Sequence, residues 1–304
     1  MIDLRVKIGD LLLKNPVLVA SGTFGYGQES GQLTNLNDLG GIVTKSISLN
    51  PRAGNLPPRI CELPAGMLNS IGLANVGLKV FVEEKLPFLQ TLDTSVIVNI
   101  AGSTDDEFLR VVQALNEEEG IDAYELNFSC PNVREGGLGF SQDARVTARV
   151  TELIRQATKR PLLVKLTPNV TKISDIARAA ADHGADAVSL INTLVGMAVD
   201  VTTRKPKIHA VTAGYSGPAI KPIALAKIYE VRTNVNIPIV GIGGIMNMTD
   251  ALEFFITGAS AIQIGTANFI DPSTGPEIAG ELKEYFANNH IKKMAEIVGT
   301  LQVG

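Results

Sequence analysis

The sequence is poor in cysteine, with only Cys61 and Cys130, which lie far apart in the chain. Two distant cysteines in a chain without export signals do not indicate a disulfide framework. A protein-bound iron–sulfur cluster normally takes four cysteine ligands, so this chain cannot supply one. We expect no metal site here either, and we interpret Cys61 as structural.

Basic residues are not in excess, because 27 Lys and Arg stand against 31 Asp and Glu, with a net charge of −4. A non-specific nucleic-acid binder needs a broad basic surface, so we expect no nucleic-acid partner. The N-terminal segment scatters Asp3, Arg5 and Lys7 among its apolar residues. We therefore expect no signal peptide, no membrane association and a cytoplasmic location.

The sequence does contain short apolar, β-branched runs that alternate with helical patterns. This alternation is typical of a parallel sheet buried on both faces. Eight such units predict a (β/α)8 TIM barrel, formed as a single domain over residues 1–304. The predicted strands span residues 16–21, 41–45, 95–101, 123–129, 161–166, 187–192, 238–243 and 261–266.

Local signals support the helices between these strands. Ser103 or Thr104 can cap a helix that begins with Asp105 and Asp106, and Gly258 is placed to end a later one. Three connections are long enough to be functional loops, and each follows a strand, so each should lie at the mouth where barrel enzymes place their chemistry. They are residues 46–76, 130–143 and 193–221.

Polar residues end most of the predicted strands. One such residue would be an ordinary loop-edge group, but several together indicate a ligand, because desolvated polar groups need partners. GIGG and IGT, which end the last two strands, suggest a phosphate site, although tight turns alone would also explain their glycines. The strand-end residues are Ser21, Lys45, Asn99, Asn127, Lys165 and Asn192.

A lysine at the end of a core strand needs negative charge nearby or must lose its proton. Lys165 therefore has three possible roles, namely a Schiff-base lysine, a cation beside a reduced flavin, or a member of a structural ion pair.

Cys130 follows the fourth predicted strand in the segment NFSCPNVREGGLGF. A lone cysteine is commonly a small buried hydrophobic residue. Here its place in a glycine-rich loop, with Asn127 and Asn132 on either side, favours a general base. Asn69, Asn127, Asn132 and Asn192 could pair with a pyrimidine edge, since a carboxamide offers both a donor and an acceptor, or could serve as turn and cap residues.

Together these motifs resemble the class 1 dihydroorotate dehydrogenases over essentially the whole chain. The resemblance rests on NFSCPNV, TKSISLNPRAGNLPPR, LNSIGLAN, VKLTPN, GIGG and IGT. It implies one FMN per chain, oxidation of dihydroorotate to orotate in pyrimidine (UMP) biosynthesis, and Cys130 as the catalytic base. It implies dihydroorotate contacts at Lys45, Asn69, Ile71, Gly72, Leu73, Asn127, Asn132, Asn192 and Thr193. It implies FMN contacts at Ser21, Lys45, Ser46, Asn99, Asn127, Lys165, Ile191, Gly217, Gly243, Gly244, Gly265 and Thr266.

Within class 1, EGGLGF and AGYSGPAIKPIAL resemble the NAD-linked type. That resemblance implies a homodimer core joined to a second subunit with FAD and a [2Fe–2S] cluster, hence a heterotetramer. Three alternatives stay open. They are a dihydropyrimidine dehydrogenase-like FMN barrel, a flavin-free aldolase-like barrel using Lys165, and a barrel that only binds a phosphorylated ligand.

Overall fold

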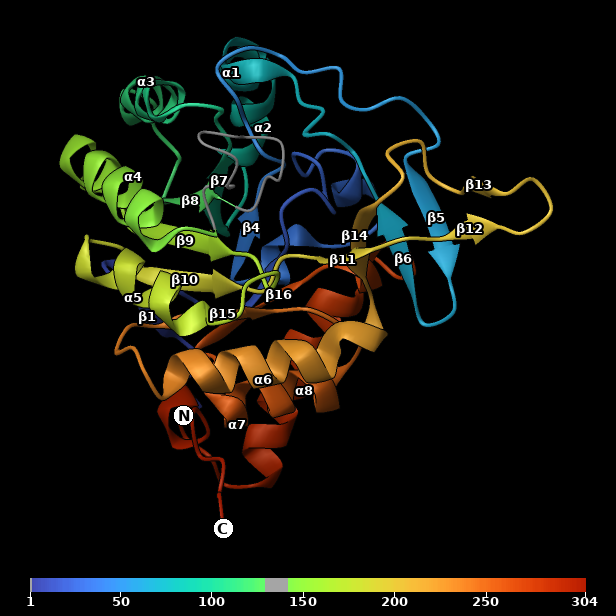
Figure 1. The fold of residues 1–304 in the computed structure, drawn as a ribbon. Coiled ribbons are helices and arrows are strands. Elements are labelled where there is room, and N and C mark those ends of the chain that lie inside the picture. The colour runs from blue at the N-terminus through green and yellow to red at the C-terminus, as the bar shows by residue number, and fades with distance from the viewer. Residues whose placement is uncertain (1, 129–141) are drawn as a thin grey trace.

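A closed barrel of eight parallel strands forms the centre of the molecule in this computed structural model, which describes residues 2–128 and 142–304 (Figure 1). The strands follow one another around the barrel in chain order, and the last pairs with the first. All eight predicted strands are present, each slightly shorter than predicted, so the (β/α)8 barrel is confirmed. They are β3 (Val17–Val19), β4 (Gly41–Val43), β7 (Ser95–Ile100), β8 (Ala123–Asn127), β9 (Leu162–Leu166), β10 (Ala187–Leu190), β15 (Ile239–Ile242) and β16 (Ala261–Ile264).

Helices pack around the outside of this barrel (Figure 1). As predicted, Thr104 caps α3 by accepting a hydrogen bond from the Glu107 amide at 3.2 Å, and Gly258 ends α7 with φ at +132°. The helices are α1 (Gly77–Val80), α2 (Leu86–Leu89), α3 (Asp105–Asn116), α4 (Ala144–Ala157), α5 (Ile173–Asp182), α6 (Lys221–Arg232), α7 (Met248–Thr257) and α8 (Thr274–Asn288), with a π-helical turn at Phe81–Lys85. Short 3-10 helices span Ser30–Gln32, Leu36–Asp38, Pro218–Ile220, Thr266–Phe269 and Met294–Glu296.

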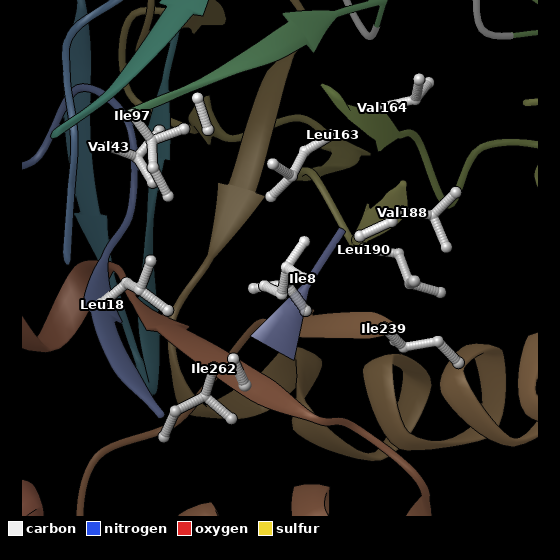
Figure 2. Packing of buried hydrophobic residues seen from close by; sticks show 14 of the residues in the cluster. Ile8, Leu18, Val43, Ile97, Leu163, Val164, Val188, Leu190, Ile239 and Ile262 are labelled. Atoms are coloured by element: carbon white, nitrogen blue, oxygen red, sulfur yellow. The ribbon is translucent and has the colours of Figure 1, made fainter. Parts of the chain in front are cut away.

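The main hydrophobic core fills the barrel and the space between barrel and helices. Strand residues point alternately into the barrel and toward the helices, so a strand covered on both sides is apolar at most positions. Figure 2 shows side chains of this core from several barrel strands, with Ile8 among them.

Ile8 belongs to an antiparallel hairpin of β1 (Val6–Ile8) and β2 (Leu11–Leu13), which the sequence analysis did not predict. Its turn passes close to Asp186, because a Cβ on Gly9 would lie 2.6 Å from the Asp186 Oδ1. Asp186 directly precedes β10, so the hairpin packs against the end of the barrel where the strands begin.

Two of the three predicted loops contain strands, which corrects the prediction for residues 46–76 and 193–221. These segments come together in a four-stranded antiparallel sheet beside the barrel mouth, the end where the parallel strands finish (Figure 1). We call it the mouth sheet. Its strands, in order across the sheet, are β11 (Leu194–Gly196), β14 (Ala213–Ser216), β6 (Gly66–Asn69) and β5 (Ile60–Leu63). A further hairpin of β12 (Val199–Asp200) and β13 (Lys205–Pro206) projects from it.

The mouth sheet has a small core of its own, formed by Leu68, Ile208 and Ala213. Cys61 lies on β5 and packs half-buried against this core, in keeping with the structural role expected of it. Within the described residues, no helix is both long and apolar enough to cross a membrane.

Candidate active site

The barrel interior brings together four of the predicted strand-end and loop residues, Ser46, Asn99, Asn127 and Lys165. Asn127 of β8 pairs in register with Lys165 of β9. The Ser46 hydroxyl donates to the Asn99 Oδ1 at 2.5 Å, and the Asn127 Nδ2 donates to the Ser46 Oγ at 3.2 Å. A connected polar group therefore crosses from β4 to β9 just below the mouth.

Beneath this group lies Glu125, a fully buried carboxylate that the sequence analysis did not single out. Its Oε1 accepts a hydrogen bond from the Asn99 Nδ2 at 3.2 Å, and its Oε2 accepts one from the Gln263 Nε2 at 2.9 Å. The Lys165 Nζ lies 4.0 Å from the same Oε1, and Lys165 is only 5% exposed. Lys165 thus has the carboxylate partner that the predicted role in a structural ion pair needs.

The sequence held a signal for Glu125 and Gln263. In a strand, residues two apart share a face, so Glu125 must face the barrel interior if Asn127 does. Gln263 bears the same relation to Gly265, which directly follows β16. A charged residue on the inner face of a barrel strand is unusual, because bulky apolar side chains dominate these layers.

Lys45 differs from Lys165 in its surroundings. In the described residues no carboxylate lies within 4.0 Å of its ammonium, although the side chain is only partly exposed. Burial lowers the pKa of Lys45, and the positive charge of Arg59 lowers it further. Two positive charges close enough to interact favour the binding of an anion.

One of the predicted dihydroorotate residues, Asn69, ends β6 of the mouth sheet, and three more lie in the turn that follows it. The Asn69 Nδ2 donates to the Gly214 carbonyl at 3.4 Å. The following turn, with Ile71, Gly72 and Leu73, runs through left-handed backbone, since φ is +72° at Gly72 and +54° at Leu73. Asn55 holds this turn by donating its backbone N–H to the Ile71 carbonyl at 3.0 Å.

Asn192 and Thr193 approach the same sheet from the barrel. The Asn192 Oδ1 accepts a hydrogen bond from the Thr193 amide at 2.7 Å. Thr193 lies so close to β14 that a Cβ on Gly214 would be 2.1 Å from the Thr193 Oγ1. Since β14 also pairs with β6, the mouth sheet connects these two residues with Asn69.

The predicted phosphate residues converge from three neighbouring connections. Gly217, Gly243 and Gly244 adopt φ values of +110°, +127° and +77°, which L-residues rarely adopt. A Cβ on Gly244 would lie 2.9 Å from the Gly217 carbonyl oxygen. Thr266, after Gly265, donates its hydroxyl to the Ser216 Oγ at 2.9 Å and begins a 3-10 helix.

Two further predicted residues border this group. The amide of the buried Ile191 donates to the Ile242 carbonyl at 3.0 Å, beside Gly243. Ser21 follows Ala20, whose amide donates to the Ile264 carbonyl at 2.8 Å, beside Gly265. Cys130 and Asn132 fall outside the described residues, so their predicted roles stay predictions. The described residues contain no cluster of His, Cys, Asp or Glu suited to a metal ion.

An α/β barrel with a buried polar layer and glycine-lined turns at its mouth has the architecture of a barrel enzyme. The dihydroorotate dehydrogenase family model matches residues 3–286. The chain therefore belongs to the dihydroorotate dehydrogenase family.

Curated relatives match over nearly their full length and carry the name dihydroorotate dehydrogenase B (NAD(+)), catalytic subunit. The protein from Geobacter sulfurreducens is 51% identical over 301 residues, and that from Geotalea daltonii is 50% identical, each covering 99% of both chains. The protein from Bacteroides thetaiotaomicron is 48% identical over 303 residues, 100% of both chains. The crystal structure of DHODH in complex with ferulenol from Eimeria tenella superposes with a TM-score of 0.79 at 21% identity, covering 98% of this chain and 88% of that one, which supports the barrel fold.

Proposed function

We propose that this chain is the FMN-binding catalytic subunit of an NAD-linked dihydroorotate dehydrogenase, which oxidises dihydroorotate to orotate in pyrimidine biosynthesis. One observation carries the proposal. The barrel mouth joins buried amide and lysine side chains to a glycine-lined set of turns, in a chain that is 48–51% identical to proteins of that name. The proposal includes a single domain over residues 1–304.

The residues present fit FMN. A Cβ would meet backbone at Gly217 and Gly244, and neighbouring side chains at Gly243, so these turns pack as they do because they carry glycine. Glycine-lined turns let backbone amide groups approach a phosphate. Lys165, Asn99 and Asn127 offer a cation and amide groups from the barrel interior for a polar ring. When bound, FMN supplies the acceptor for the hydride that leaves C6 of dihydroorotate.

The chain's own residues would hold the substrate and take its proton. Asn69, Asn127, Asn132 and Asn192 would pair with the alternating N–H and C=O groups of the pyrimidine edge. Lys45 would bind negative charge on the substrate, since the described residues give it no carboxylate partner. Cys130 would accept the proton from C5, and because a free thiol has a pKa of about 8.5, it needs local assistance near neutral pH.

Electron transfer to NAD would require a second subunit. Two cysteines cannot ligate a [2Fe–2S] cluster, and the glycine-lined turns are already assigned to FMN. The relatives' name, catalytic subunit, supports such a partner. We propose that the partner holds FAD and the cluster, and that two copies of each subunit form a heterotetramer around a dimer of this chain.

The visible spectrum of the purified protein, followed by anaerobic mixing with dihydroorotate, tests this proposal. Bound FMN should colour the protein yellow and should bleach with dihydroorotate but not with dihydrouracil. A colourless protein with aldolase activity would favour the aldolase-like alternative. A colourless protein without any enzymatic activity would favour the barrel that only binds a phosphorylated ligand. Bleaching with dihydrouracil would favour the dihydropyrimidine alternative. NAD reduction should require co-expression with the partner subunit.

A further inference from the structure

Glu125 is the most unusual residue of the barrel interior. It lies on β8 two positions before Asn127, about 6.6 Å back along the strand at 3.3 Å per residue, and therefore deeper in the barrel. It is fully buried, in a layer that barrels usually fill with Val, Ile or Leu. A carboxylate removed from water is costly unless positive charge and hydrogen bonds compensate it, so a specific role must explain its presence.

Two of the three contacts of Glu125 are with proposed cofactor residues. One oxygen accepts from Asn99 and lies 4.0 Å from the Lys165 Nζ, and the other accepts from Gln263 on the opposite side of the barrel. Asn99 is also fixed from above, because its Oδ1 accepts from the Ser46 hydroxyl at 2.5 Å. Glu125 thereby determines which end of the Asn99 amide faces down, and it holds Lys165 in place.

Charge gives Glu125 a second effect. The Glu125 carboxylate and the Lys165 ammonium form a nearly neutral pair, and they are the only oppositely charged side chains within 4.0 Å of each other inside the described part of the barrel. Interactions between charges are strong in such a dry interior. Any group bound above Lys165 therefore experiences the sum of the two charges, and not that of the lysine alone.

We propose that Glu125 is a positioning residue that sets the reduction potential of the bound flavin by balancing the charge of Lys165. This inference rests on the proposed function, because it assumes that FMN binds above Lys165. Reduction adds negative charge to a flavin, so a nearby carboxylate makes reduction harder and a nearby ammonium makes it easier. With both charges present, the reduction potential lies between the value that the carboxylate alone would give and the value that the ammonium alone would give.

A double-mutant cycle tests this inference by dye-equilibrated reduction of the FMN-loaded protein. Glu125→Gln keeps the size and one acceptor oxygen but removes the charge, so the flavin potential should shift upward. Lys165→Met should shift it downward. The double variant should fall between the two single variants. Ser189→Ala is the matched control, because Ser189 pairs in register with Lys165 and is buried, yet its change alters no charge.

A purely structural role for Glu125 predicts a different result. Glu125→Gln would then lose melting temperature or FMN content, while the flavin that stays bound would keep the wild-type potential, and the inference would be overturned. If Glu125→Gln cannot retain FMN, the double variant still decides, since a potential equal to that of Lys165→Met alone overturns the inference. Wild-type flavin that dihydroorotate fails to reduce would contradict the proposed function but leave this cycle measurable.

Discussion

The barrel interior and the mouth sheet hold their polar residues in different ways. Inside the barrel, Asn99, Glu125 and Gln263 are fully buried and are linked side chain to side chain. On the mouth sheet, Asn69 is partly exposed and its position depends on backbone pairing between β6 and β14. The proposed cofactor residues inside the barrel are therefore part of the main core, whereas Asn69, on the substrate side, depends on a separate, smaller one.

This difference implies that FMN binding and orotate binding can be changed separately. A substitution in the barrel interior should alter the flavin, and one in the mouth sheet should alter orotate affinity. The predictions below challenge that division, beginning with a residue outside the described part of the chain.

Cys130→Ala should have the largest effect. If Cys130 is the general base, the variant should retain FMN and orotate but lose about 10²- to 10⁴-fold in the rate of flavin reduction by dihydroorotate. Stopped-flow bleaching under anaerobic conditions measures this rate. Cys130→Ser should keep slight activity, shifted to higher pH. A wild-type rate in Cys130→Ala would show that Cys130 is not the base.

Lys45→Met should weaken orotate binding by about 10- to 100-fold, because hydrogen bonds to charged groups contribute about 1.5–3 kcal/mol. Burial, together with the charge of Arg59, lowers the pKa of Lys45. The ammonium is therefore lost at a lower pH than in a free lysine, so wild-type orotate affinity should fall as pH rises through that range.

Orotate titrations from neutral to alkaline pH measure the effect, and the variant should lack this pH dependence. Lys283→Met is the control, because it removes the same charge from an exposed position on α8 that is none of the proposed contacts. A pH dependence that persists unchanged in Lys45→Met would assign it to another group.

Gly244→Ala should weaken FMN binding about tenfold while leaving the mouth sheet intact. A Cβ at this position would lie 2.9 Å from the Gly217 carbonyl, and φ is +77°, so the turn must shift. Gly280→Ala on α8 is the control, because its Cβ would meet nothing within 4 Å. FMN release followed by fluorescence compares them, and equal release from both would remove Gly244 from the phosphate site.

The sequence predicted the barrel well because its signals were local and strong. Each barrel strand is a short run of apolar, often β-branched residues, and a polar residue at or near the end of most of them marks the mouth. The caps at Thr104 and Gly258 were equally direct, since a single side chain or a single φ value sets them. These features need no knowledge of distant contacts.

The mouth sheet was missed because its strands lack such signals. β6 reads GMLN and β14 reads AGYS, with glycine and few β-branched residues, so tertiary pairing alone makes them strands. Glu125 was missed for a different reason, because it stands inside an otherwise apolar strand. Glu125 lies two residues before Asn127 and so shares its face of the strand, which could have indicated that it points into the barrel. Its partners Gln263 and Lys165, however, come from distant parts of the chain.

Leu68→Ala should have the smallest effect and tests the division most directly. Leu68 is buried in the small core of the mouth sheet, apart from the core of the barrel. Its truncation leaves a cavity there, so the sheet should open more often and only the closed fraction should bind orotate well. We expect orotate affinity to fall about 2- to 10-fold, with unchanged FMN content and an unchanged flavin potential. Ile60→Ala on β5 is the control, because Ile60 is 59% exposed on the same sheet. Parallel loss of FMN and orotate in Leu68→Ala would mean that the mouth sheet and the barrel interior are one cooperative unit.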